Sequence, residues 1–80
     1  MKDLMGFVLG NQHRERVMKV LGSKGAMPAE KIAKLERLTP PAARKVLEDL
    51  ASRGLIAESD GSWSLTAEGL ELEKEMKRRT

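Results

Sequence analysis

Apolar side chains recur three and four positions apart along three stretches in the first two thirds of the chain, which is the spacing of amphipathic helices. Asn11 precedes the first stretch, and its side-chain oxygen can accept a backbone N–H at a helix start. Thr39 and Pro40 precede the third, where Thr39 can cap and Pro40 suits the first helical position. The pattern predicts three helices, over residues 12–21, 29–35 and 40–53.

The third predicted helix, Pro40 to Arg53, has two distinct faces. An apolar stripe indicates the face that packs against the first helix and the hairpin: it consists of Ala43, Val46, Leu47 and Leu50. The opposite face carries Pro41, Lys45, Glu48 and Ser52, flanked by Arg44 and Asp49. Gly54 follows and can adopt the left-handed conformation that commonly ends a helix.

Beyond Gly54 the pattern changes to two short extended segments, residues 55–58 and 62–65. Between them stands Asp60-Gly61, a dipeptide typical of two-residue hairpin turns, because both central residues of such a turn have positive φ. A longer loop would shift the strand register. The two-residue turn places three apolar side chains on the face towards the helices, namely Ile56, Trp63 and Leu65.

Thr66 can cap a last helix over residues 67–78, whose apolar side chains face two ways. On one side, which we expect to dock on the rest of the domain, lie Ala67 and Leu70. On the nearly opposite side lie Leu72 and Met76.

The predicted order of elements is α-α-α-β-β-α with a short extra helix at residues 1–10, a mainly α fold with a small β-hairpin. Eighty residues suit one domain. We therefore expect residues 1–80 to form a single winged helix-turn-helix domain, with its three-helix core at 12–53, its wing at 55–65 and a C-terminal helix at 67–78. In such a unit the third helix presents its exposed face to the major groove of DNA.

Two motifs in this chain resemble a known family. Leu50-Ala51-Ser52-Arg53-Gly54-Leu55-Ile56, followed after the hairpin by Leu65-Thr66-Ala67-Glu68-Gly69, resembles the junctions of third helix, wing and final helix in MarR-like winged-helix transcription regulators. The resemblance covers residues 11–76 and implies a cytoplasmic, usually dimeric, DNA-binding repressor or activator. The chain departs from that pattern because it is much shorter, and because its wing has Asp60 at the tip and no Lys or Arg over residues 55–66.

Basic side chains are concentrated in the middle of the chain, which favours a polyanionic partner. Residues 11–53 hold ten Lys or Arg against five Asp or Glu, whereas residues 54–80 hold four against six. The predicted DNA-reading residues on and before the third helix are Thr39, Pro41, Arg44, Lys45 and Ser52. The predicted phosphate contacts are Arg14, Arg16, Lys19, Lys31 and Lys34. Each of these five cations alone fits a solvated helix surface better, and only the cluster favours phosphate contact.

Two acids, Glu48 and Asp49, lie on the helix that is predicted to enter the major groove of DNA. They can pair with Arg44 and Lys45 within the helix. They can also accept hydrogen bonds from cytosine amino groups, although repulsion from phosphates is the simpler expectation.

No residue pattern predicts catalysis, a metal or a cofactor. The chain has no cysteine and one histidine, His13, so a cysteine–histidine zinc site is excluded, and a surface or capping role is expected for His13. No nucleophile motif or phosphate-binding glycine loop occurs, so the protein is predicted not to be an enzyme. Trp63 could stack on a base, but the hairpin register favours the core. The five methionines suit core and interface packing.

Apolar side chains at the two ends of the chain exceed what one small core needs. They predict a homodimer, because exposed apolar patches often form interfaces and a two-fold dimer reads two half-sites. The predicted interface residues are Leu4, Met5, Val8, Leu72 and Met76. Alternatively, the N-terminal segment folds back over the last helix within one chain. That segment is too short to span a membrane and lacks a signal-peptide pattern, so a cytoplasmic protein without membrane contact is expected.

Two functions fit these observations. The first is sequence-specific binding of double-stranded DNA in transcription regulation, with the helix Pro40 to Arg53 in the major groove. The alternative is a winged-helix protein–protein interaction module of a larger assembly that does not read DNA directly. The acidic wing and the mixed charge of the third helix permit this alternative, and the salt dependence of duplex binding separates the two functions.

Overall fold

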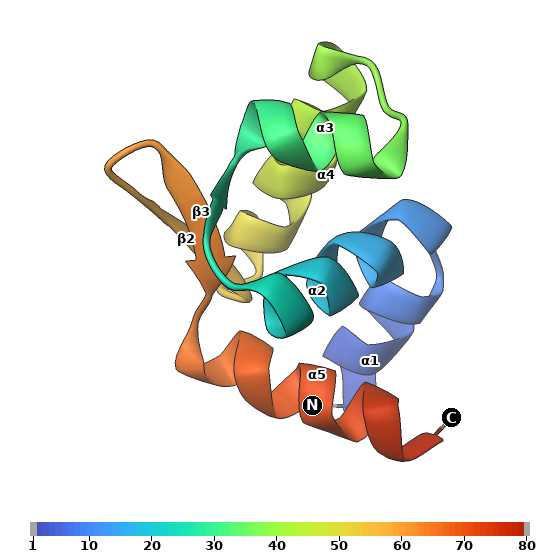
Figure 1. The fold of residues 1–80 in the computed structure, drawn as a ribbon. Helices are drawn as coiled ribbons and strands as arrows, with labels where there is room; N and C mark the ends of the chain where they lie inside the picture. The colour runs from blue at the N-terminus through green and yellow to red at the C-terminus, as the bar shows by residue number, and fades with distance from the viewer. Residues whose placement is uncertain (1, 80) are drawn as a thin grey trace.

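The computed structural model describes residues 2–79, with the side chains of residues 3–78, and these form five helices and a three-stranded sheet (Figure 1). The helices are α1 (Lys2–Leu9), α2 (Gln12–Lys24), α3 (Ala29–Glu36), α4 (Pro40–Ser52) and α5 (Ala67–Arg79). The strands are β1 (Met27–Pro28), β2 (Ile56–Ser59) and β3 (Ser62–Leu65). The predicted winged-helix order is confirmed. Met1 and Thr80, which begin and end the predicted domain, lie outside the described residues.

Helix α2 begins as predicted but ends three residues later than predicted. Asn11 Oδ1 accepts two backbone N–H groups of the first turn, at 2.9 and 3.2 Å. Gly22, which directly follows the predicted end of this helix, is still helical, and it faces Glu73 of α5: a Cβ there would lie 2.6 Å from the Cδ of Glu73. The helix ends instead at Gly25, which has a φ of 83°. Gly22 therefore serves a close approach between helices.

The wing is the hairpin of β2 and β3, and its predicted two-residue turn is confirmed. Asp60 and Gly61 have φ of 51° and 83°. The pairs Ile56 with Leu65 and Glu58 with Trp63 put their side chains on one face of the sheet. Strand β1, which was not predicted, pairs with the other edge of β3, and its two residues are too few to show an alternating pattern.

The core lies where all five helices and the wing meet. The apolar stripe of α4 is buried in it against α2 and β2, as predicted. The core cluster contains Met5, Val8, Val17, Met18, Leu21, Met27, Ile32, Val46, Leu47, Leu50, Leu55, Ile56, Leu72 and Met76. Four of these are methionines, whose flexible side chains fill irregular space.

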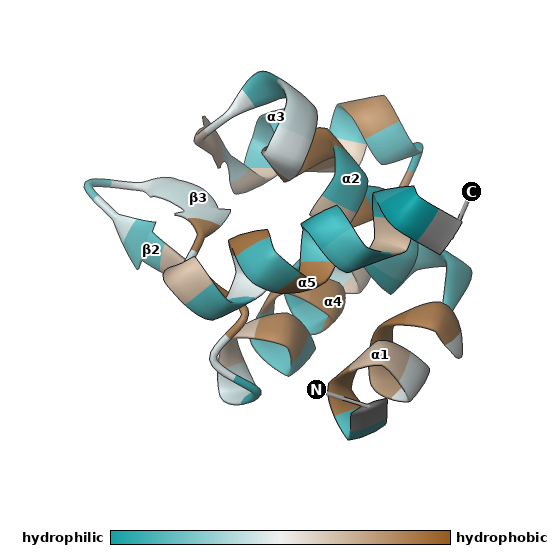
Figure 2. Cartoon of the chain, turned by 90° about the horizontal axis from the view of Figure 1, so that it is seen from below, coloured by the Kyte–Doolittle hydropathy of each residue, from teal (hydrophilic) through white to brown (hydrophobic). Residues whose placement is uncertain are grey.

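Helix α5 docks with the face opposite to the one predicted. Leu72 and Met76 are 0% and 2% exposed, whereas Leu70 is 43% exposed and Ala67 points to solvent. Figures 1 and 2 show α1 and α5 on the same side of α2, and these three helices contact one another.

The predicted homodimer interface is corrected by this packing. Met5 and Val8 of α1 are buried against the same cluster as Leu72 and Met76, and Leu4 is half-buried beside them. The apolar side chains at the two ends of the chain cover one another within a single chain, which was the alternative. No described helix is long and apolar enough to span a membrane.

Leu47 provides a direct test of this core. Leu47 is 1% exposed, so Leu47→Ala leaves a cavity and should lower the free energy of unfolding by about 2–5 kcal/mol. The matched control is Leu35→Ala on α3, where the side chain is 44% exposed and the loss should stay below about 1 kcal/mol. Urea titration of both variants measures the difference. Equal losses would show that α4 presents another face to the core.

Candidate nucleic-acid interface

Helix α4 begins sharply and exposes one polar strip. Thr39 Oγ1 accepts the backbone N–H of Ala42 at 3.3 Å, and Pro40 occupies the first helical position, where its missing N–H has no consequence. Residues three and four apart share a helix face. The exposed strip is formed by Pro41, Arg44, Lys45 and Glu48, all of which point away from the core.

A short turn holds α4 against α3. Arg37 ends α3 in the left-handed conformation, with φ 55° and ψ 44°. The backbone N–H of Leu38 then donates to the Ala33 carbonyl at 2.8 Å, and the Leu38 side chain packs against the core. Only residues 37–39 separate the two helices, so α3 and α4 form a helix-turn-helix whose second helix exposes its polar strip.

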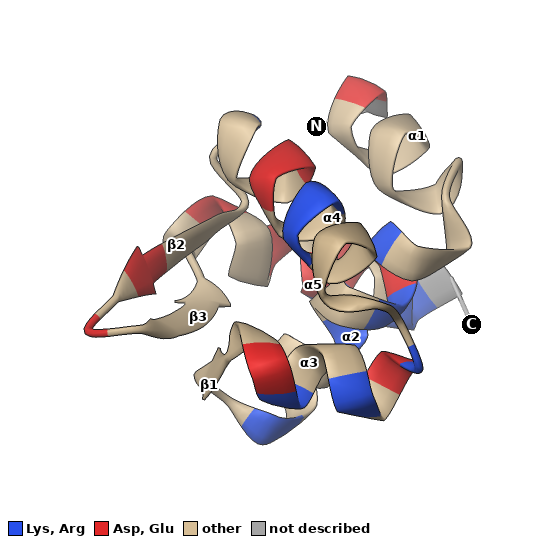
Figure 3. Cartoon of the chain, turned by 90° about the horizontal axis from the view of Figure 1, so that it is seen from above, with Lys and Arg blue, Asp and Glu red and all other residues tan. Residues whose placement is uncertain are grey.

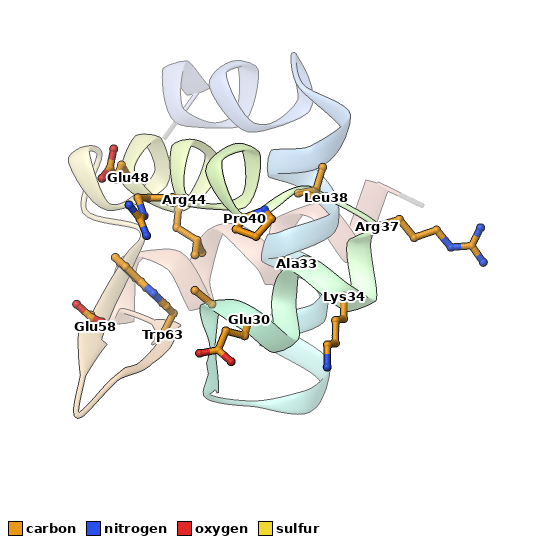
Figure 4. Close-up of a pocket in the computed structure, with 12 residues that line it drawn as sticks. Glu30, Ala33, Lys34, Arg37, Leu38, Pro40, Arg44, Glu48, Glu58 and Trp63 are labelled. Carbon is orange, nitrogen blue, oxygen red and sulfur yellow. The ribbon is translucent and has the colours of Figure 1, made fainter.

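A groove of about 810 Å³ lies between α3, α4 and the wing. It is lined by Ala29, Glu30, Ala33, Lys34, Arg37, Leu38, Pro40, Arg44, Leu47, Glu48, Glu58 and Trp63. In Figure 4, Arg44 and Glu48 lie beside each other on α4 at the end of the groove where Trp63 and Glu58 of the wing stand, and Arg37 points away. Arg44 and Glu48 of the strip therefore share this groove with Glu58 and Trp63 of the wing.

The wing contributes negative charge to this side of the molecule. Glu58 and Asp60 are exposed, and Figure 3 shows the tip of the hairpin in red. Phosphates beside the wing would be repelled, because like charges in partly screened solvent disfavour approach. The wing thus differs from a basic wing that grips the DNA backbone.

Asp49 forms ion pairs with two of the residues predicted to contact DNA, Arg14 and Lys45. Its Oδ2 lies 3.3 Å from Arg14 Nη2 of α2, and its Oδ1 lies 3.4 Å from Lys45 Nζ. Partial burial opposes ionisation of Asp49, but the hydrogen bonds and attraction of Arg14 and Lys45 outweigh it and lower the pKa of Asp49 below its usual value. Asp49 is therefore held as a carboxylate between α2 and α4.

Arg14 also joins α1 to this network. Its Nη1 donates to the Phe7 carbonyl at 3.1 Å, and its guanidinium lies 4.0 Å from the centre of the Phe7 ring. The guanidinium of Arg53 lies 4.3 Å from the same ring. Phe7 thus contacts two cations, and cation–π attraction adds to the packing of α1. This arrangement gives Arg14 a structural role, and its contact with phosphate stays a prediction.

The other predicted DNA contacts are distributed over two sides. Lys31 and Lys34 are exposed on α3, and Lys34 borders the groove. Arg16 and Lys19 instead border a second hollow, between α2, α3 and α5, and Lys19 pairs with Glu15 at 3.0 Å. Ser52 Oγ donates to the Asp49 carbonyl at 2.7 Å within α4. The structure thus brings Lys34 and Arg44 to one groove and leaves Arg16 and Lys19 at another.

Sequence reasoning missed the place of Trp63 in the groove. Its side chain is half-buried: one side packs against the core, as predicted, and the residue also lines the groove opposite α4. The pairing of Glu58 with Trp63 across the hairpin was the available signal, since paired residues share a face. His13 is half-buried in the first turn of α2, and residues 3–78 contain no cluster of metal-binding side chains.

Comparison with known proteins identifies this architecture. No protein-family model and no curated protein matches the chain in sequence. Solved structures match closely in fold. A variant of ZitR from Lactococcus lactis in its apo form superposes with a TM-score of 0.79 at 26% identity, over 98% of this chain and 64% of ZitR.

Two further structures carry the family in their names. The MarR family protein Rv2887 of Mycobacterium tuberculosis has a TM-score of 0.79 at 24% identity, over 94% of this chain and 58% of that protein. NMB1585, a MarR family regulator from Neisseria meningitidis, has a TM-score of 0.75 at 24% identity, over 86% and 54%. The chain thus spans about half to two thirds of the length of these structures.

The helix-turn-helix, the hairpin behind it and the exposed strip of α4 define a winged-helix protein. The chain has the winged-helix fold of the MarR family regulators, and the resemblance noted in its sequence is confirmed as a likeness of fold. This fold is consistent with DNA-binding regulation of transcription.

Proposed function

We propose that the protein binds double-stranded DNA in a sequence-specific manner, with α4 in the major groove, and regulates transcription. One observation carries the proposal: α4 exposes Arg44 on a strip that no part of residues 3–78 covers, and Arg44 takes part in no ion pair among these residues. A major groove admits an α-helix, and a free guanidinium can donate two hydrogen bonds to one guanine.

The residues around α4 supply the rest of the contact. Thr39 and Pro41 stand at the N-terminal end of α4, which enters the groove first in helix-turn-helix proteins. Lys31 and Lys34 are exposed on α3, and we expect them to neutralise phosphates on one flank. In this proposal the protein acts in the cytoplasm, by binding and not by catalysis, and without a cofactor.

A homodimer belongs to this proposal as well. Two copies related by a two-fold axis would read two half-sites about one helical turn apart. Met5, Val8, Leu72 and Met76 are buried within one chain, so they do not form the exposed patch of that dimer. Sedimentation equilibrium measures the mass, with and without duplex DNA.

The mixed charge on the surface of α4 and the wing favours a second function, which is binding to another protein. Arg44 and Lys45 are balanced by Glu48 and Asp49 along α4, and the wing adds only acids. Such a surface suits a protein partner in a larger assembly, where DNA is not read directly.

Titration of random duplex DNA at two salt concentrations separates the functions. With about three neutralised phosphates, affinity should fall roughly 40-fold between about 50 and about 200 mM salt, because counterions are released on binding. Fluorescence anisotropy of a labelled duplex measures both affinities. A well-folded protein that binds no duplex at the lower salt would favour the protein-interaction function.

A further inference from the structure

Glu48 and Asp49 are neighbouring acids on α4, and the structure gives them different surroundings. Asp49 is 26% exposed in its side chain, lies on the flank of α4 towards α2 and holds Arg14 and Lys45. Glu48 is exposed on the groove side and takes part in no ion pair among residues 3–78. Asp49 is therefore engaged within the fold, whereas Glu48 is available to a partner.

Glu48 and Arg44 stand one helical turn apart on the same side of α4. Four residues along a helix place two side chains next to each other, and both of these line the groove (Figure 4). They nevertheless form no ion pair, although Lys45 and Asp49, at the same spacing, do. The strip therefore presents one free guanidinium and one free carboxylate in fixed order along the helix.

We infer that Arg44 and Glu48 together determine which DNA sequence is bound, with Glu48 selecting cytosine. The inference rests on the proposed function. An ionised carboxylate only accepts hydrogen bonds, and cytosine offers an amino donor at its major-groove edge. Adenine offers an amino donor beside the N7 acceptor, which repels a carboxylate, while guanine and thymine present acceptors there. Arg44 has the complementary preference, for guanine O6 and N7.

The acid also reduces binding to other sequences. The repulsion between a carboxylate in the groove and the phosphates does not depend on the base sequence, so Glu48 weakens contact with all duplexes alike. Only a cytosine amino group at the right place compensates for this repulsion. The exposed strip thus combines weak general affinity with discrimination between bases, which is how specificity arises as a difference of affinities.

Selection from a pool of randomised duplexes tests the inference, with wild type and Glu48→Gln compared. The wild type should enrich cytosine at one position. Glutamine can donate to N7 and accept from the amino group of adenine, so Glu48→Gln should shift that position from cytosine to adenine by about tenfold or more. Circular dichroism of both proteins shows that the fold is retained.

Asp49→Asn is the matched control, because it makes the same change of charge one residue along. This change releases Arg14 and Lys45 from their ion pairs and removes a carboxylate from the flank, so affinity should rise for all duplexes with the base preference unchanged. If Glu48→Gln also raises affinity uniformly and leaves the preferred bases unchanged, Glu48 is not a reading residue and the inference fails while the proposed function stands. A folded wild type that binds no duplex overturns both.

Discussion

Reversing Arg44 and Lys45 together to glutamate should abolish detectable binding to duplex DNA. Both side chains lie on the exposed strip of α4, so the change replaces two donors with two acceptors where bases and phosphates would lie. The loss combines a missing bidentate base contact with added phosphate repulsion, and should exceed about 100-fold in affinity. Anisotropy titration at low salt measures it.

The control is a second double variant with the same net charge as the first. Lys24→Glu together with Lys74→Glu changes the same number of charges at exposed positions on α2 and α5, away from the groove. Its affinity should fall only slightly, through the general field of the molecule. Equal losses in the two double variants would show that binding depends on overall charge and would remove α4 as the reading helix.

Leu72→Lys should prevent the chain from folding, whereas Leu70→Lys should leave it folded. Leu72 is 0% exposed and packs with α1 and the core, so lysine there removes apolar burial and forces an ammonium group into the interior. The cost should exceed about 4 kcal/mol, much of the stability of a domain this small. Leu70, two residues away, is 43% exposed and can accept a lysine at little cost.

Thermal unfolding followed by circular dichroism measures both variants of α5. The pair distinguishes burial within the chain from burial between two chains. A Leu72→Lys protein that melts like the wild type but sediments as a lighter species would restore Leu72 to a subunit interface and overturn the packing of α5 described above.

Local signals in the sequence determined most of the element boundaries. Asn11 and Thr39 cap helices through their own side chains, and Asp60-Gly61 accepts the positive φ that a two-residue turn requires, so each acts within a few residues of itself. The buried stripe of α4 was predictable for a similar reason, because one helix with a single apolar face has one way to dock.

Contacts between segments far apart in the sequence determined the features that local signals did not predict. Helix α5 has apolar residues on two sides, and the side that docks depends on α1, which covers Leu72 and Met76 from the other end of the chain. Gly22 lies just beyond the predicted helix, and only the packing of α5 shows that a glycine is needed there, because any Cβ would clash with Glu73. Strand β1 exists only because β3 offers a free edge.

The candidate site was likewise predictable in part from the sequence. Its location on α4 followed from the sequence, since the order of helices and hairpin predicts which helix faces DNA. The roles of its charges did not, because Glu48 and Asp49 are adjacent and chemically alike. Arg14, 35 positions away from Asp49 along the chain, engages one acid and leaves the other free. Ion pairing between distant residues depends on three-dimensional proximity, which only the packing of α2 against α4 establishes.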